Sequence, residues 1–265
     1  MTRTSRLVMC ALGLVTTAAF AAAPAQQDAR PSAKPTIILV HGAFEDGSAW
    51  QRVIIGLQRE EYNVVAAQLP LTSLANDVEA TKRVVDSQSG PVVLVGHSWG
   101  GAVITVAAAG NPRVKALVYV AAFAPEANEV VTAYGEEYPS RLNAALRPDS
   151  AGFVTVDPAQ FQELFASDVP AAEARVAAAT QKPMSAKAFG DAVDRAAWKS
   201  IPAYYVLTLD DQAIHPDLQR FYADRMHATT TPIKSSHAVI VSHAAQVSRV
   251  IVEAARNGSM RGEQR

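Results

Sequence analysis

Cysteine is almost absent from this sequence: its 265 residues include one, Cys10, in an amino-terminal stretch that we expect to be removed. The remaining chain therefore excludes disulfides, a thiolate zinc cluster and a cysteine nucleophile. Charged residues are also few, at 18% of the chain. The 24 Lys and Arg against 25 Asp and Glu give a formal net charge of -1, which argues against nucleic-acid binding as the main function. Neither an HExxH motif nor a paired Cys/His spacing predicts a metal site.

The first residues are typical of a secretory signal peptide. Arg3 and Arg6 precede an apolar region, Leu7–Phe20, and small residues follow as far as Ala25. We expect cleavage after Ala25 and export to the periplasm or the exterior. A retained membrane anchor is the alternative, but the apolar region falls short of the roughly 20 residues that span a bilayer. Lipid modification of Cys10 is disfavoured because this residue lies inside the apolar region rather than after it.

After a polar, proline-broken lead-in at residues 26–35, short apolar runs alternate with helical patterns, and the sequence predicts one domain over residues 36–265. Such alternation is typical of a mostly parallel sheet with helices on both faces, an α/β fold. The predicted strands are Thr36–Val40, Asn63–Ala66, Pro91–Val95, Val114–Val120, Ala203–Leu209 and Thr229–Ile233. The predicted helices are Ser48–Glu60, Leu74–Ser87, Gly100–Ala109, Pro216–Met226 and Ala244–Ala255.

Residues 125–199 interrupt this alternation. They contain several proline steps, no convincing long strand and short alanine-rich helical pieces such as Pro170–Thr180. We interpret them as a small helical insertion over one end of the sheet.

The strongest local motif is Gly-His-Ser-Trp-Gly at residues 96–100, which follows an apolar run and precedes a helical pattern. A strand, Gly-x-Ser-x-Gly and a helix in this order form a nucleophile elbow, a sharp turn that exposes a serine hydroxyl above the sheet. Gly96 and Gly100 omit the Cβ atoms that would collide in this turn, and the helix dipole favours developing negative charge. Ser98 is therefore the candidate nucleophile. Adjacent side chains point apart in a sharp turn, so His97 is expected to pack at the elbow rather than act as the base.

A glycine-containing turn follows the first predicted strand, at His41-Gly42-Ala43. It can turn a backbone N–H toward the end of the sheet where Ser98 lies. We expect the N–H groups of Ala43 and Trp99 to form an oxyanion hole. His41 is expected to fix this loop by hydrogen bonding rather than to act in catalysis.

An acid and a base follow later strands, in the chain order Ser, Asp, His that a hydrolase triad can take. Asp210 and Asp211 end the strand before the fourth predicted helix, and His237 follows the last strand. Residues beyond the carboxyl ends of parallel strands converge, so His237 can take a proton from Ser98 while a carboxylate orients its ring. The residues alone leave Asp210 and Asp211 open. His215, His227 and His243 are further imidazoles that we place at the ends of helices.

Residues 36–255 resemble the α/β-hydrolase superfamily, and more closely its small plant-type methylesterase and hydroxynitrile-lyase branch with bacterial esterase relatives. The matching segments are VHGAFEDGSAW at 40–50, GHSWGG at 96–101, YYVLTLDDQAIHPDLQRF at 204–221 and SSHAVIVSH at 235–243. The resemblance implies an α/β-hydrolase fold in which residues 125–199 form the lid.

The resemblance also implies roles for single residues. It selects Asp211 as the acid, five residues before the proline that begins the next helix, and supports His237 as the base and the amides of Ala43 and Trp99 as oxyanion donors. Candidates for the substrate pocket are Phe44, Phe153, Phe161, Phe165 and Trp198.

This sequence departs from the lyases of the branch at two positions. The lyases that resemble it have a hydroxyl residue after the first-strand histidine and a lysine after the catalytic histidine, and these groups bind and protonate cyanide. Here the two positions are Gly42 and Ala238, which disfavours the lyase reaction.

The leading hypothesis is a secreted serine carboxylesterase that acts on small to medium esters and needs no cofactor. The alternatives are cofactor-free perhydrolase or haloperoxidase-like chemistry, or a carbon–carbon lyase, on the same triad. A non-enzymatic ligand-binding protein with this fold is a further alternative. The expected partner is a small-molecule ester. The sequence indicates no nucleic-acid partner, no membrane span once the signal is removed, and no particular oligomeric state.

Overall fold

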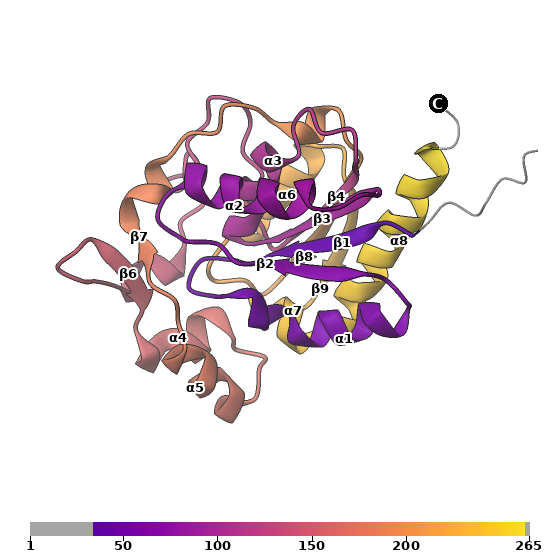
Figure 1. The fold of residues 1–265 in the computed structure, drawn as a ribbon. Coiled ribbons are helices and arrows are strands. Elements are labelled where there is room, and N and C mark those ends of the chain that lie inside the picture. Colours follow the sequence, from indigo (N-terminus) through magenta and orange to yellow (C-terminus); the bar gives the residue numbers. More distant parts are fainter. Residues whose placement is uncertain (1–33, 263–265) are drawn as a thin grey trace, which may run out of the picture. The chain divides into compact units, whose positions relative to one another are not determined.

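Six parallel strands form the main sheet in residues 34–262, the part of the chain that this computed structural model describes. Their order is β2-β1-β3-β4-β8-β9 (Figure 1). Parallel neighbours cannot be joined by tight hairpins, so long connections cross over the sheet between them. The strands are β1 (Thr36–Val40), β2 (Val64–Ala67), β3 (Val92–His97), β4 (Val114–Val120), β8 (Ala203–Thr208) and β9 (Thr229–Ile233).

Helices cover both faces of the sheet because alternate strand residues point to opposite sides. In β1, Ile37 and Leu39 belong to one buried apolar cluster, and Ile38 and Val40 belong to the other. The first cluster is covered by α1 (Gln51–Arg59), α7 (Val239–Ser242) and α8 (Ala244–Gly262), and the second by α2 (Leu74–Asp86), α3 (Trp99–Ala107) and α6 (Pro216–Arg225) (Figure 1). A 3-10 turn, η1 (Gly47–Trp50), leads into α1.

These elements confirm the predicted fold class. Each of the six expected strands is present, and the bounds of β1, β4 and β9 agree with the predicted ranges. Local signals also set the helix starts: the Ser73 hydroxyl accepts from the Asn76 N–H at the start of α2, and Pro216 occupies the first turn of α6.

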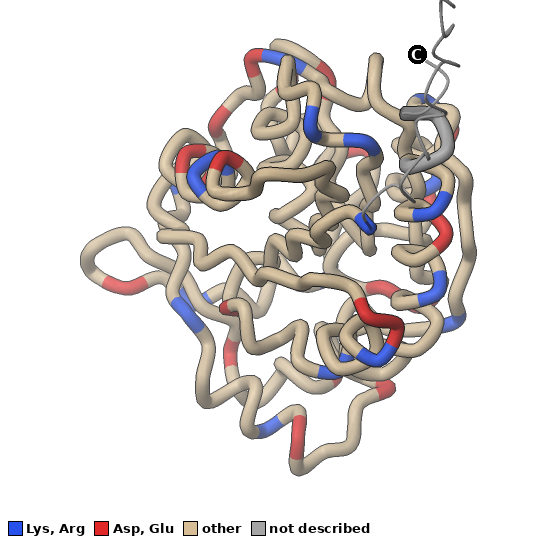
Figure 2. Tube along the Cα trace, turned by 45° about the vertical axis from the view of Figure 1, so that its right-hand side comes forward, with Lys and Arg blue, Asp and Glu red and all other residues tan. Residues whose placement is uncertain are grey.

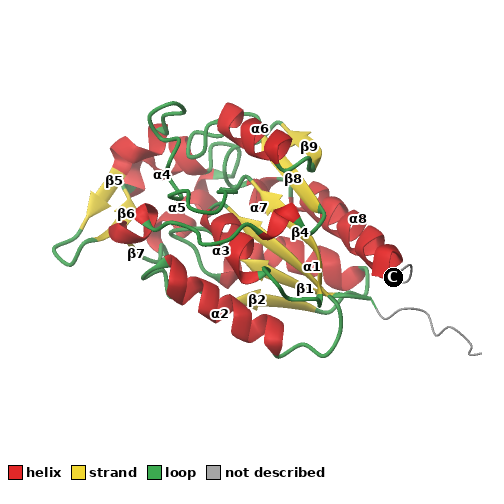
Figure 3. Cartoon of the chain, turned by 90° about the horizontal axis from the view of Figure 1, so that it is seen from above, coloured by secondary structure: helices red, strands yellow, loops and turns green. Residues whose placement is uncertain are grey.

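Residues 125–199 contain more than the short helices that the sequence predicted. The helices α4 (Pro158–Phe165) and α5 (Ala171–Ala179) are accompanied by an antiparallel sheet of β5 (Leu146–Pro148), β6 (Phe153–Val156) and β7 (Met184–Ser185) (Figure 3). The expectation of a helical insertion is corrected to a mixed one. Residues of β6 are alternately half-buried and buried, the pattern of a strand with one covered face. The segment also contains η2 (Arg141–Ala145), η3 (Ala186–Gly190) and η4 (Ala197–Lys199).

The predicted signal peptide, residues 1–25, and most of the lead-in at 26–35 lie outside the described residues. Within residues 34–262, no helix combines the length and the apolar character that a membrane crossing requires. Basic and acidic residues are interspersed along this part of the chain (Figure 2).

An ion pair joins the insertion to the end of α6. Arg225 contacts Glu129 at 2.6 Å and donates to the carbonyl of Ala124 at 2.8 Å, and the hydroxyl of Tyr134 donates to Glu129 at 2.7 Å. Burial alone raises the pKa of Glu129, but hydrogen bonds from Arg225, the Glu126 N–H and Tyr134, together with the charge of Arg225, outweigh burial and hold this pKa below its ordinary value. The carboxylate form of Glu129 therefore stabilises the folded chain.

The Glu129→Gln variant is expected to unfold at a lower urea concentration than the wild type at neutral pH. Because the folded-state pKa is depressed, the contribution of the charge is complete above about pH 5 and is lost as the pH falls through the folded-state pKa. The difference between the two urea midpoints should therefore shrink below about pH 4. Urea titrations across this range measure it, with Glu253→Gln on the exposed face of α8 as the control. A difference that stays constant with pH contradicts the role of the charge.

Candidate active site

The turn after β3 holds Ser98 in an unusual backbone conformation. Ser98 has φ 51° and ψ -118°, and its N–H donates to the carbonyl of Val120 in β4 at 3.1 Å. A non-glycine residue at positive φ is strained, and such strain often marks a functional site. α3 begins at the next residue, Trp99, so the amino-terminal end of this helix lies beside the serine. The strand, the strained serine and the helix together make a nucleophile elbow.

Glycine is required at three positions around this serine because other atoms of the chain lie too close for a Cβ atom. A Cβ atom on Gly100 would lie 2.4 Å from the carbonyl oxygen of Val40, and one on Gly96 would lie 2.4 Å from the carbonyl oxygen of Gly100. At Gly42, a Cβ atom would lie 2.9 Å from Cβ of Ser98. The loop after β1 can therefore approach the serine only because Gly42 has no side chain.

His237 and Asp211 meet beyond the carboxyl ends of β9 and β8. His237 Nδ1 lies 2.8 Å from Oδ2 of Asp211, and both side chains are almost fully buried. Asp211 Oδ1 accepts from the N–H groups of Ala213 and Ile214. Burial raises the pKa of Asp211, but the charge and hydrogen bond of His237, with hydrogen bonds from the Ile214 N–H and Thr208, outweigh burial and lower this pKa overall. The carboxylate is thus ionised and able to orient the imidazole.

The structure distinguishes the two neighbouring aspartates. Asp210 is exposed to solvent, whereas Asp211 points inward to His237. Thr208 and Gln219 also donate to Oδ2 of Asp211, at 2.8 and 2.9 Å. This geometry favours Asp211 as the partner of His237.

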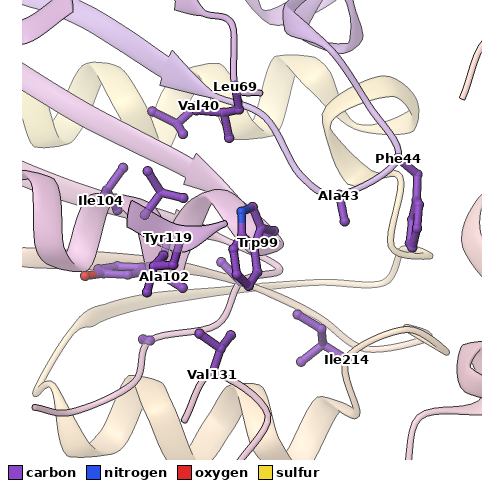
Figure 4. Close-up of a cluster of buried hydrophobic side chains, with 14 of the residues drawn as sticks. Val40, Ala43, Phe44, Leu69, Trp99, Ala102, Ile104, Tyr119, Val131 and Ile214 are labelled. Atoms are coloured by element: carbon purple, nitrogen blue, oxygen red, sulfur yellow. The ribbon is translucent and has the colours of Figure 1, made fainter. Parts of the chain in front are cut away.

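The predicted oxyanion donors lie on two segments that face each other. Ala43 and Phe44 are on the loop after β1, opposite Trp99 at the start of α3 (Figure 4). The N–H of Trp99 belongs to the first turn of α3, where amides lack partners within the helix. The indole Nε1 of Trp99 donates to the buried carboxylate of Asp77 at 2.8 Å, which fixes its ring.

One cavity joins these groups. It has a volume of about 500 Å³, and Ser98, His237, Ala43 and Trp99 all contribute to its wall. The rest of the lining is mainly apolar, and part of it comes from the insertion and from the loop before α6. Val131 and Ile214 approach Trp99 there (Figure 4). Other apolar lining residues are Phe123, Leu142, Leu146, Phe189 and Leu218.

Two of the five predicted pocket residues, Phe44 and Phe165, line this cavity. Phe165 also packs edge to face on the ring of His237, with 4.7 Å between ring centroids. Phe161 stacks on Phe165 and lines a smaller neighbouring cavity. The structure does not bring Phe153 or Trp198 to the cavity: Phe153 is half-buried in β6, and the indole of Trp198 donates to the carbonyl of Pro125.

The other histidines occupy the structural positions that the sequence indicated. His41 is fully buried and fixes its loop, because Nδ1 donates to the carbonyl of Gly42 and Nε2 accepts from the N–H of Leu69. His227 and His243 lie just after α6 and just before α8. His215 caps α6 and, in addition, lines the cavity, which the sequence did not predict.

Two carboxylates that contact this site were missed by sequence reasoning. Asp168, between α4 and α5, accepts hydrogen bonds from the hydroxyls of Ser235 and Ser236, directly before His237. Glu45, two residues after Ala43, is mostly buried against the ring of His97. Asp168 lies in no motif that the sequence offers. Glu45 falls within the matching segment VHGAFEDGSAW at 40–50, which was the usable signal, but the segment alone did not single it out.

Metal binding finds no support in the side chains described. Across residues 34–262, no group of three or more His, Cys, Asp or Glu side chains is arranged to hold a metal ion.

Comparison with known sequences assigns this chain to a family. The model of a family described as "Alpha/beta hydrolase family" matches residues 37–250. The alpha/beta hydrolase nvfD of Aspergillus novofumigatus is 27% identical over 244 residues, which are 84% of this chain and 97% of that protein. A carbendazim hydrolyzing esterase of a Nocardioides species is 30% identical over 131 residues, 44% of this chain and 51% of that protein.

Solved structures share the fold at lower sequence identity. A pyrethroid hydrolase from Sphingobium faniae superposes with a TM-score of 0.71 at 21% identity, covering 84% of this chain and 97% of that one. Polyneuridine aldehyde esterase superposes with a TM-score of 0.73 at 18% identity, covering 83% of this chain and 98% of that one. These likenesses confirm the arrangement of the sheet and its helices.

Proposed function

Because the chain belongs to the alpha/beta hydrolase family, we propose that it is a serine carboxylesterase that cleaves small to medium carboxylic esters. The observation that carries the proposal is the cavity whose wall includes Ser98, His237, Ala43 and Trp99, with Asp211 hydrogen-bonded to His237. Hydrolases and esterases among the similar proteins support this reaction class.

The proposed reaction begins when the hydroxyl of Ser98 attacks the ester carbonyl. His237 Nε2 accepts the hydroxyl proton while Asp211 holds Nδ1 and stabilises the imidazolium. The N–H groups of Ala43 and Trp99 stabilise the negative charge on the carbonyl oxygen. His237 then returns the proton to the departing alcohol. A water molecule, activated by the same histidine, hydrolyses the acyl-enzyme and restores Ser98.

The surroundings of the serine support hydrolysis over cyanohydrin cleavage. Gly42 lies against Ser98, and a side chain there would collide with its Cβ atom. Ala238 is buried, and its N–H donates to the carbonyl of Phe165. Neither position offers the hydroxyl or ammonium group that the lyases of the branch use.

The apolar cavity supports an ester with an apolar acyl or alcohol group. A volume of about 500 Å³ lies in the range of pockets that enclose small organic molecules. Each methylene that enters such a cavity contributes about 0.8 kcal/mol, or about fourfold in kcat/KM, until the cavity is full.

A p-nitrophenyl ester series from acetate to hexadecanoate tests the proposal. We expect kcat/KM to rise from acetate to acyl chains of medium length and to fall for the longest chains, which exceed the cavity. The same protein is also assayed with a cyanohydrin, and with peroxide and a carboxylic acid, where we expect slower turnover. Tight ester binding without turnover contradicts the proposal and favours the ligand-binding alternative.

We further propose that the enzyme is exported, on the basis of the amino-terminal charge and apolar pattern of residues 1–25. Amino-terminal sequencing of protein recovered outside the cytoplasm tests this, and Gln26 is the expected first residue. A mature protein that begins at Met1 contradicts it.

A further inference from the structure

A buried pair of side chains lies behind the nucleophile and has no part in the proposed proton transfers. Glu45 Oε2 lies 2.9 Å from Nδ1 of His97 and accepts the N–H of Gly42 at 3.0 Å. The side chain of His97 is 0% exposed, and that of Glu45 is 11% exposed. A Cβ atom on Gly42 would lie within 3.1 Å of Ser98 Cβ, Glu45 Oε2 and His97 Nδ1, so these groups meet at one point.

The second ring nitrogen of His97 reaches the loop of the proposed base. Nε2 of His97 lies 3.0 Å from the carbonyl oxygen of His237, and the two rings lie 4.8 Å apart between centroids. One side-chain pair thus bonds to the oxyanion loop at Gly42 and to the backbone of His237. Its histidine directly precedes Ser98. The pair thereby ties the end of β3 to the loop after β1 and to the loop after β9.

Hydrogen-bond chemistry defines the charge of this pair. A carbonyl oxygen only accepts, so Nε2 of His97 must carry a proton. A carboxylate also only accepts, so Nδ1 must carry a proton if Glu45 is ionised. Burial lowers the pKa of His97 and raises that of Glu45, but their mutual attraction outweighs burial, so the pKa of His97 is raised and that of Glu45 is lowered. An imidazolium paired with a carboxylate satisfies each contact.

We propose that Glu45 and His97 are positioning residues for the esterase reaction. As a buried carboxylate–imidazolium pair, they fix the positions of the loop after β1, which includes Gly42 and Ala43, and of the backbone of His237 relative to Ser98. The inference rests on the proposed function. The titratable groups that face His97 are Glu45 from the loop after β1, Asp211 from the loop after β8 and His237 from the loop after β9.

Glu45→Gln separates this role from simple packing because it preserves shape and removes charge. One atom, Oε2, contacts both the Gly42 N–H and the ring of His97. If the glutamine oxygen takes this place, His97 becomes a buried cation with no counter-charge and loses a proton near neutral pH. If the remaining proton is on Nδ1, Nε2 has no proton to donate to the carbonyl of His237. The hydrogen bond between His97 and the backbone of His237 is then lost.

Kinetics give the first readout. We expect Glu45→Gln to lower kcat by about 10- to 100-fold with little change in KM, because misplaced groups slow the chemical step more than ground-state binding. His97→Gln should lower kcat similarly. The double variant should be no worse than either single variant, because the two residues act as one unit. Glu79→Gln, an exposed glutamate on α2, is the matched control. Unchanged kcat in Glu45→Gln, or losses that multiply in the double variant, overturn the inference.

Nitrogen NMR of the full chain labelled with ¹⁵N-histidine gives a readout that needs no turnover. In the wild type, we expect the ring of His97 to carry both protons at neutral pH and to lose one only at a higher pH than an ordinary histidine, because Glu45 raises the pKa of His97. His97→Gln assigns its signals. A singly protonated His97 ring at neutral pH in the wild type overturns the ion pair. If the ester series shows no turnover while the His97 ring remains doubly protonated, the proposed esterase function is wrong, but the ion pair between Glu45 and His97 is confirmed.

Discussion

Ester hydrolysis by the Ser98→Ala variant is expected to fall by about 10⁴- to 10⁶-fold in kcat, the scale on which serine hydrolases depend on their nucleophile. The variant loses the oxygen that forms the acyl-enzyme and retains the cavity, His237 and the amides of Ala43 and Trp99. A residual rate above the uncatalysed reaction is expected, because the oxyanion donors still bind the reacting carbonyl. Initial rates on the best p-nitrophenyl ester of the series measure the loss.

Folding must be unaffected for this result to be informative. Alanine keeps the Cβ atom of Ser98, so the strain at φ 51° is the same in both proteins. We therefore expect equal thermal unfolding midpoints for the wild type and Ser98→Ala. Turnover within tenfold of the wild type by a folded Ser98→Ala protein contradicts the role of this serine.

The second large effect is expected for Asp211→Asn, at about 10⁴-fold in kcat. Asp211 Oδ2 accepts from Thr208, Gln219 and Nδ1 of His237, while Oδ1 accepts two backbone N–H groups. In the asparagine variant, the side-chain NH2 group cannot face the N–H groups of Ala213 and Ile214, because these are also donors. It therefore faces His237. His237 then becomes the tautomer with its proton on Nε2, and this nitrogen cannot accept the proton of Ser98.

Asp210→Asn is the matched control for this prediction, since Asp210 is the exposed neighbour in the same turn. We expect it to retain the activity of the wild type, whereas Asp211→Asn loses it. The reverse result, with activity lost at position 210 and kept at 211, means that the folded arrangement of the two aspartates differs from the one described here.

Periodicity and motifs predicted most of the fold because the elements are locally consistent. β1 and β4 are apolar runs between polar or glycine-containing segments, and α2 begins at a serine cap. The small antiparallel sheet was not predicted because β6 has four residues and its partners have three and two. Strands this short have too few residues to show alternation, and their pairing depends on the packing of the whole insertion.

The candidate site also contains some residues that a local pattern reveals and others that depend on contacts between distant segments. Ser98 lies within a local motif, so the sequence alone could single it out as the candidate nucleophile. The partners Glu45 and His97 are 52 residues apart, and Asp168 and Ser236 are 68 residues apart. No local pattern encodes such contacts, because they arise when segments far apart in the sequence, including the connection between α4 and α5, meet in the folded chain. Phe153 and Trp198 show the converse: large apolar residues in an insertion can pack elsewhere than in its cavity.

Covalent labelling of the serine tests the central claim most directly. The wild type is incubated with an organophosphonate, and intact mass, peptide mapping and ester turnover are followed in parallel. We predict one adduct per chain, located on Ser98, that forms at the rate at which turnover is lost, and no adduct in Ser98→Ala. Turnover that persists when Ser98 is fully modified, or is lost through modification of a different residue, contradicts a serine hydrolase built on Ser98, His237 and Asp211.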